Sequence, residues 1–257
     1  CKGGGQIRHF GKDGEYVSKG KGIRAYKTTL NLFNGSIFNN YATNEEGGGI
    51  YLSNSVFNMY GGSIKGNAAD KGGGGICSED NSTVTIYAGE ISGNKVHDGN
   101  GGAIKSNIGQ GYNKMDADLR IYGGKITDNY ASACGGAVYS ANETYLGGNI
   151  TFERNRDKFY NSYGYVDFYI NNDSYKWNEY RIWVDSALTG TSFRVEFKNP
   201  TTKIATSGED YTITESDMAR INYQKKGYTK YLSNGNVNAL KTLANTDFDV
   251  TFDKTSK

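Results

Sequence analysis

The segment FNMYGGSIKGN, residues Phe57 to Asn67, occurs again in recognisable form further along the chain. VTIYAGEISGN ends at Asn94 and LRIYGGKITDN ends at Asn129. With the isoleucine after the glycines as anchor, LNLFNGSIFNN and the degenerate ETYLGGNITFERN also align. The five anchors are Ile37, Ile64, Ile91, Ile126 and Ile150, at intervals of 27, 27, 35 and 24 residues. Intervals of this size are typical of one coil of a solenoid.

Apolar and polar residues alternate within each repeat, as in Leu30-Asn31-Leu32. Alternation with period two predicts a β-strand with one face inward. Each strand breaks at a glycine such as Gly62, where a corner needs backbone angles that a side chain resists. A second anchor, at the end of a GI or GGxI-like motif, comes before each repeat: Ile23, Ile50, Ile76, Ile104 and Val138. Because each strand returns one coil later in the same direction, we expect parallel pairing and an all-β parallel solenoid.

A column of asparagines closes the repeats. Asn40, Asn67, Asn94 and Asn129 each follow their anchor by three residues, whereas Asn155 is displaced relative to Ile150. Asparagine tolerates the left-handed backbone conformation, and stacked amides can form hydrogen bonds from one coil to the next. We expect these amides to stack.

The composition excludes several classes of protein. The 257 residues include 36 glycines and one proline, and 29 basic residues nearly cancel 27 acidic ones, which predicts no nucleic-acid partner. No run of eighteen apolar residues is present, and the first residues lack the apolar core of a signal peptide. Three cysteines, Cys1, Cys77 and Cys134, fit neither a disulfide framework nor zinc spacing, although Cys1 could be a lipidated first residue or a boundary of the excised chain.

The repeats resemble the right-handed parallel β-helix repeats of large bacterial cell-surface proteins, including adhesin-like ones. They are more distantly similar to polymorphic outer membrane protein repeats, whose GGA[ILV] and FxxN motifs appear as Gly101 to Ile104, Gly135 to Val138 and Phe152 to Asn155. The resemblance implies a right-handed β-helix with a capped C-terminal end. Residues 1–154 would form the repeat coils, 155–245 the terminal coils and cap of the same domain, and 246–257 a linker or the start of a following module.

A capping box is predicted near the C-terminal end. Thr214-Glu215-Ser216-Asp217 has the pattern that starts a short helix, with Met218 and Ile221 on one face. Such a helix could cover the open end of the solenoid, which otherwise offers unpaired strand edges. The segment from Tyr160 to Tyr180 is assigned to no particular coil.

Carboxylates do not gather on the predicted strands. Of the outward columns, only the one after the corner holds an acid, Glu90, so we predict no catalytic residues and no enzyme. His9 and His97 form no metal site or catalytic triad. Asp80, Asp116 and Asp118 lie in one series of loops and are weak candidates for calcium; no other cofactor is expected. An acidic cleft beside them would instead favour a carbohydrate-active enzyme of the lyase or glycosidase kind.

An aromatic column is the best candidate for ligand binding. Phe33, Tyr60, Tyr87 and Tyr122, followed by Leu146, come directly after inward residues and are expected to point outward. Stacked tyrosines suit a glycan or a host or matrix protein, but stacking that only stabilises the sheet is an alternative. Tyr112, in the insertion Ser106 to Leu119, is a second candidate.

These observations and the resemblance together lead to one expectation about function. We expect an extracellular, non-enzymatic module of a cell-surface or secreted protein, acting in adhesion or in structural presentation of other domains of that protein. A self-associating extracellular fibre is a further alternative, because the incomplete first coil, GGGQIRHF, shows no evident cap and leaves a solenoid end open.

Overall fold

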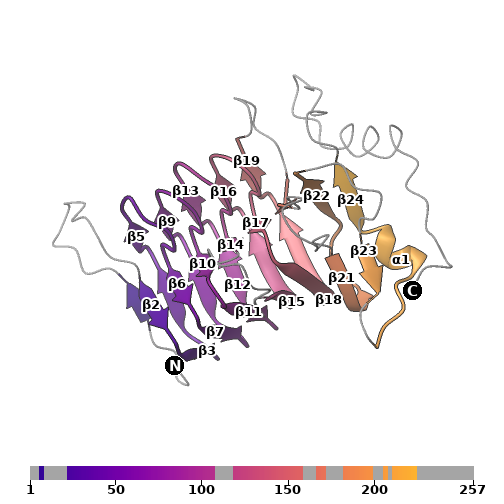
Figure 1. Cartoon of the computed structure of the whole chain (residues 1–257), viewed down its shortest axis with the longest axis horizontal. Helices are drawn as coiled ribbons and strands as arrows, with labels where there is room; N and C mark the ends of the chain where they lie inside the picture. The colour runs from indigo at the N-terminus through magenta and orange to yellow at the C-terminus, as the bar shows by residue number, and fades with distance from the viewer. Residues whose placement is uncertain are drawn as a thin grey trace.

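The computed structural model describes residues 6–8, 22–107, 118–158, 166–171, 182–198, 205–207 and 210–224. Its strands stack as a parallel β-solenoid of about six turns, seen from the side in Figure 1. Three parallel sheets run along the axis and enclose one narrow core. The predicted fold class is confirmed.

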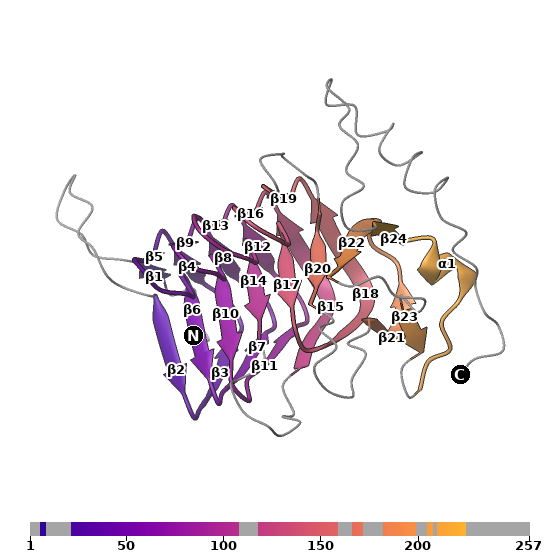
Figure 2. The ribbon, with the colours of Figure 1, turned by 45° about the horizontal axis from the view of Figure 1, so that its top comes forward.

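The first sheet has eight strands, which lie side by side in Figure 2. In spatial order they are β2 (Ile23–Tyr26), β6 (Ile50–Ser53), β10 (Ile76–Glu79), β14 (Ile104–Ser106), β17 (Val138–Ser140), β20 (Phe168–Ile170), β22 (Phe193–Phe197) and β24 (Ile221–Gln224). Ile50 pairs with Ile23 and Ile76, and Ile104 with Ile76 and Val138. The second set of anchors therefore forms one inward column, as predicted, which is partly buried at Ile23 and buried from Ile50 onward. β20 also places part of the segment that sequence reasoning left unassigned.

The second sheet has eleven strands and turns a corner within each coil. On one side of the corner are β3 (Thr29–Leu32), β7 (Val56–Met59) and β11 (Thr83–Ile86); on the other are β1 (Gln6–Arg8), β4 (Ser36–Phe38), β8 (Ser63–Lys65) and β12 (Glu90–Ser92). β15 (Asp118–Thr127) and β18 (Glu143–Glu153) run through the corner, and β21 (Ile182–Leu188) and β23 (Ala205–Ser207) follow. The inward residues Leu32, Met59, Ile86 and Ile121 are buried, as predicted.

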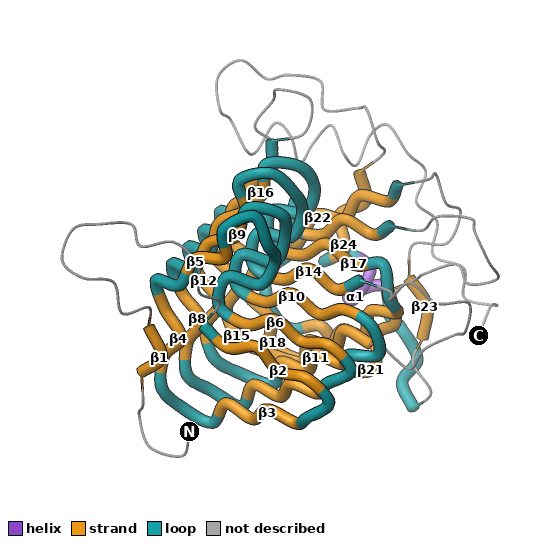
Figure 3. The backbone as a smooth tube through the Cα atoms, turned by 60° about the vertical axis from the view of Figure 1, so that its left-hand side comes forward, coloured by secondary structure: helices purple, strands orange, loops and turns teal. Residues whose placement is uncertain are grey.

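The third sheet has five strands of two residues each. They are β5 (Tyr41–Ala42), β9 (Ala68–Ala69), β13 (Lys95–Val96), β16 (Tyr130–Ala131) and β19 (Arg156–Asp157). The loops that follow β5, β9, β13 and β16 rise together along one edge of the solenoid (Figure 3). Small inward residues such as Ala42, Ala69 and Ala131 are buried, which lets this corner of the coil stay narrow.

A corner glycine shows why the strands break where they do. Gly62 has φ +79°, and a Cβ built on it would lie 2.6 Å from the carbonyl oxygen of Gly35 in the preceding coil. An L-residue is strained at this φ, and the neighbouring coil leaves no room for its side chain. The corner therefore requires glycine for both reasons.

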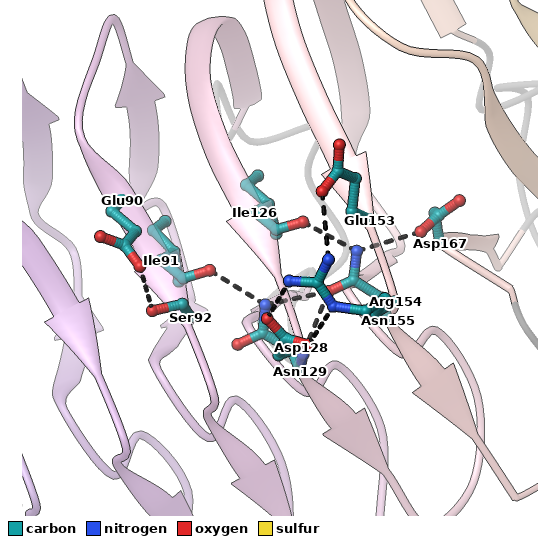
Figure 4. A network of polar contacts seen from close by, with 10 residues as sticks. All are labelled: Glu90, Ile91, Ser92, Ile126, Asp128, Asn129, Glu153, Arg154, Asn155 and Asp167. Atoms are coloured by element: carbon teal, nitrogen blue, oxygen red, sulfur yellow. Dashed lines mark hydrogen bonds and ion pairs between the residues drawn. The ribbon is translucent and has the colours of Figure 1, made fainter.

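The asparagines form a continuous buried ladder of amides, part of which is drawn in Figure 4. The Oδ1 of Asn94 accepts from the backbone N–H of Asn67 (2.9 Å) and from its Nδ2 (3.0 Å). The Nδ2 of Asn67 also donates to the carbonyl of Ile37 (2.9 Å). Asn155 belongs to the same ladder, because its Oδ1 accepts from the backbone and Nδ2 of Asn129. The prediction that Asn155 is displaced was wrong.

Asn155 stays in the asparagine ladder because the pairing of β18 with β15 shifts in register. Residue Ile126 pairs with Phe152 and not with Ile150, because an irregularity after Ile121 absorbs the difference in length. Phe152 therefore takes the anchor position, and Phe152 and Asn155 keep the spacing of the other coils. The same pairing places Leu146 opposite Ile121, where it is fully buried. Leu146 is therefore not part of the aromatic column.

The predicted capping box is confirmed at α1 (Glu215–Met218), at the C-terminal end of the described solenoid (Figure 1). The Thr214 side chain accepts from the Asp217 N–H, and the Asp217 carboxylate accepts from the Thr214 N–H (2.8 Å). Asp217 Oδ1 also accepts from the backbone N–H of Leu188 in β21 (2.8 Å), which fixes α1 to the last coils. Ile221 belongs to β24 and not to the helix face. No helix among the described residues is long and apolar enough to cross a membrane.

Candidate functional site

Three rings of the predicted aromatic column form a regular stack on the solenoid wall. The ring centroids of Phe33 and Tyr60 are 5.0 Å apart with an interplanar angle of 10°, and those of Tyr60 and Tyr87 are 5.0 Å apart at 3°. The backbone sets this spacing: the Tyr60 N–H donates to the Leu32 carbonyl, and the Tyr87 N–H to the Met59 carbonyl. We call Phe33, Tyr60 and Tyr87 the aromatic ridge.

The ridge is exposed along its whole length. Phe33, Tyr60 and Tyr87 are 44%, 43% and 44% exposed. No hydrogen bond of the Tyr60 or Tyr87 hydroxyl is found among the described residues. Because neighbouring rings stack face to face, each covers the flat face of the next, and the ridge presents ring edges and hydroxyl groups to solvent. Only the terminal rings leave one face without a ridge neighbour.

Tyr122, the fourth predicted residue, departs from the stack. Its ring is tilted by 37° from that of Tyr87, with a centroid separation of 6.0 Å. Its hydroxyl donates to the Asp185 carboxylate (2.8 Å) from β21. Burial and this hydrogen bond raise the pKa of Tyr122 to about 12. Tyr122 is therefore tied to β21, two strands further along the sheet, at the end of the ridge. Tyr112 lies outside the described residues.

The predicted calcium candidates are engaged with neighbouring side chains where they are described. Asp80 accepts from the Ser53 hydroxyl (2.5 Å), and Asp118 forms an ion pair with Arg120 (2.6 Å). Asp116 lies outside the described residues. Among the residues that the structure describes, one group of three metal-capable side chains comes together, and neither Asp80 nor Asp118 belongs to it.

That group is Glu46, Cys77 and Glu79, whose ligand atoms lie within 4.8 Å of one another. It lies on the outer side of the eight-stranded sheet, where β10 supplies Cys77 and Glu79. The Cys77 thiol donates to Glu46 (3.0 Å), and the Tyr51 hydroxyl donates to Glu79 (2.7 Å). The Lys105 ammonium lies 2.5 Å from Glu46 and 3.8 Å from Glu79.

The charges of this cluster are unequal. Burial raises the pKa of Glu46, but hydrogen bonding and attraction to Lys105 outweigh it, and the net pKa is lowered. Burial and the neighbouring Glu46 raise the pKa of Glu79. Burial, followed by the Glu46 charge, also raises the pKa of the Cys77 thiol well above its ordinary value, so the thiol stays protonated. Lys105 supplies positive charge beside both carboxylates.

Sequence reasoning missed this cluster for a local reason. Tyr51, Cys77 and Lys105 stand in one predicted outward column, and their register is confirmed. Glu46, however, comes from the loop before β6 and reaches across to β10 and β14. A column-by-column comparison of strands cannot place a loop residue over a sheet face.

Comparison with known proteins finds no match: no protein-family model, no curated protein and no solved structure is significantly similar to this chain. The class of protein that the fold defines is therefore the parallel β-solenoid.

Proposed function

We propose that this domain is a non-enzymatic binding module of an extracellular surface or secreted protein, acting in adhesion or presentation, and that the aromatic ridge is its contact surface. The observation that carries the proposal is the exposure of three aligned rings, each more than two-fifths accessible. Exposed aromatic groups that are arranged on a rigid scaffold are enriched at protein interfaces. The parallel backbone fixes their spacing before any partner arrives, which lowers the entropy cost of binding.

A protein partner fits the ridge better than a sugar chain. A pyranose stacks on the flat face of an aromatic ring, and in the ridge these faces are turned toward each other. Ring edges and the hydroxyls of Tyr60 and Tyr87 are what the ridge offers. Such a strip suits the apolar and hydrogen-bonding groups of a protein surface.

The proposal is tested with the variant F33S/Y60S/Y87S, screened beside the wild-type domain against extracellular matrix proteins and a glycan array. The matched control is Y139S, which removes a stacked tyrosine whose ring centroid lies 5.7 Å from that of Tyr169 on the eight-stranded sheet. We expect wild type and Y139S to bind the same protein and the ridge variant, with an unchanged circular dichroism spectrum, to lose at least tenfold in affinity. Unchanged binding by the folded ridge variant would refute the proposal.

One observation favours the alternative of a carbohydrate-active enzyme. Glu46 and Glu79 have pKa values shifted in opposite directions, which is the arrangement of a general base and a general acid. Their ligand atoms, however, are closer than the separation of about 5 Å or more between the carboxyl groups of glycosidases. Assay of reducing-end release or of unsaturated uronate formation from polysaccharides, with E79Q beside wild type, distinguishes the two. Turnover that E79Q abolishes would replace the binding proposal.

A further inference from the structure

An open hollow of about 610 Å³ lies beside the five-stranded sheet and is lined by Lys95, His97, Tyr130 and Arg156. Parallel register brings its members together: Lys95 of β13 pairs with Tyr130 of β16, and Tyr130 pairs with Arg156 of β19. Lys95 and Arg156 are thus two strands apart, about 9–10 Å along the axis. This sheet is near the upper edge of the tube in Figure 3.

The hollow carries positive charge that neighbouring acids compensate only in part. Lys95 and Arg156 are exposed, and no ion pair of either is found in the part of the chain that the structure describes. None of the four lining residues is acidic. The Lys95 ammonium lies 5.8 Å from the centre of the Tyr130 ring, so the aromatic ring is already positioned beside the cation.

Two acids lie near the hollow, and their hydrogen bonds go to groups other than Lys95 and Arg156. Asp128 receives two hydrogen bonds from the guanidinium of Arg154, at 2.6 and 2.7 Å (Figure 4), and attraction to Arg156 is a smaller cause of its lowered pKa. Asp70 accepts from the backbone of Asn44 and the hydroxyl of Tyr41, and these hydrogen bonds lower its pKa. Asp70 also lies 3.3 Å from Nδ1 of His97, at the border of the hollow. The two long cations remain available for an anion from outside.

We propose that this hollow binds an anionic polysaccharide that carries carboxylate or sulfate groups. Two cations separated along the solenoid axis can each meet a charge on successive units of a repeating chain, whereas a single small anion can satisfy only one of them well. Tyr130, between the cations, offers apolar surface for sugar C–H groups. The patch is too short for nucleic acid, which needs an extended stripe of basic residues.

The inference rests on the proposed function only in treating the domain as a binding module, and it concerns a different face from the ridge. Its test is titration calorimetry of the domain with heparin, polygalacturonate, neutral dextran and a single-stranded DNA oligonucleotide, at low and at high salt. Heparin or polygalacturonate should bind the wild type at low salt and weaken as salt rises. Absence of binding by both, or equal binding of dextran or DNA, would overturn the proposal.

Matched variants locate the binding. K95Q/R156Q keeps the aliphatic stems and should lose at least tenfold in affinity. K65Q/K125Q removes the same charge from exposed positions of the eleven-stranded sheet and should stay within twofold of wild type. Y130A should weaken binding more than Y130F, which retains the ring. Equal losses in both double variants would show only a general effect of charge and would refute the site.

The ridge variant F33S/Y60S/Y87S separates this inference from the proposed function. It should bind the anionic polysaccharide as the wild type does, even where it has lost the protein partner. Loss of polysaccharide binding in this variant would place the polysaccharide on the ridge and overturn the assignment to the hollow.

Discussion

The asparagine ladder and the aromatic ridge are both columns of similar residues that repeat once per coil, yet one is closed and the other open. In the ladder, the buried amides of Asn67, Asn94 and Asn129 form hydrogen bonds with the coils on both sides. In the ridge, the rings contact one another but their edges and two hydroxyls face solvent. Stacking in register thus stabilises the fold in the asparagine ladder, which lies inside the coil. In the aromatic ridge, which lies outside the coil, the same stacking presents a surface to solvent.

The largest effect is expected from breaking the ladder. N94A removes an amide that donates to the carbonyl of Ile64 and accepts from Asn67. It leaves buried donors and an acceptor without partners, so we expect a loss of about 3–5 kcal/mol in the free energy of unfolding, measured by urea denaturation. N58A is the control; it removes a half-buried amide whose side-chain hydrogen bond, among the described residues, goes to Asn31, and it should cost about 1 kcal/mol. Equal losses in N94A and N58A would contradict a structural role specific to the ladder.

A second test concerns the corner beside the ridge. G62A introduces a Cβ at 2.6 Å from the Gly35 carbonyl oxygen and at a positive φ, and should cost about 2–3 kcal/mol. Gly93 also has a positive φ, but a Cβ built on it would lie 3.9 Å from its nearest neighbour, the backbone nitrogen of Gly66. The control variant G93A therefore measures the backbone strain alone, which should cost about 1 kcal/mol. If both variants lose the same stability in urea denaturation, the close approach of neighbouring coils is not what requires glycine at Gly62.

The C-terminal end of the ladder introduces a dependence on pH. The amide of Asn155 donates to Asp167, and burial raises the pKa of Asp167 to about 6. Burial, together with the charges of Glu196 and Asp167, raises the pKa of Asp157 to about 8. Because the folded state binds these two protons more tightly than the unfolded state, Asp157 and Asp167 contribute stability that is greatest at acid pH and is lost as pH rises from about 4 to 8.

D157N should flatten this dependence. Its neutral amide can still accept the hydrogen bond that Gly135 donates to Asp157. We expect a higher Tm than wild type at pH 8 and little difference at pH 5, measured by thermal denaturation across that range. A wild-type Tm that rises steadily from pH 5 to pH 8 would contradict the direction of the shift.

The smallest effect on stability is expected in the ridge. Y60S removes two stacked contacts, each worth about 0.5–1.5 kcal/mol, but exposes no buried polar group. We expect a loss of about 1–2 kcal/mol in urea denaturation, and no measurable loss for Y87F, which removes only a hydroxyl. A loss in Y60S as large as that in N94A would favour the alternative that the ridge serves mainly to hold the sheet together.

Residue spacing was enough to predict the coils, because in-register parallel pairing translates a repeat in sequence into a column in space. The isoleucine anchors, corner glycines, inward residues and capping box follow from that rule and from local chemistry. The rule failed at β18, where the spacing changed and the repeat was aligned on Ile150. Counting back three residues from Asn155 would have found Phe152, since the ladder tolerates no displacement of its amides.

The sites depend less directly on spacing. The ridge was visible as Phe33, Tyr60 and Tyr87 in one column, but the tilt of Tyr122 follows from Asp185, which lies 63 residues further along the chain. The cluster of Glu46, Cys77 and Glu79 forms because Glu46 extends from a loop and contacts Cys77 in β10 and Lys105 in β14. The hollow is lined by outward residues of two-residue strands, Lys95, Tyr130 and Arg156. These three residues differ in chemical type, so the sequence alone does not mark them as one column.

Local pattern thus specified the class of fold, the direction of strand pairing and most of the core, because those depend on periodicity and on backbone angles that neighbouring residues impose. The tertiary structure settled which faces of the aromatic rings are covered. It also settled that Glu46 and Glu79 lie side by side and that Lys95 and Arg156 line one hollow. Such properties arise from distances between residues of different coils and loops, and a repeat pattern constrains those distances only for residues that belong to it.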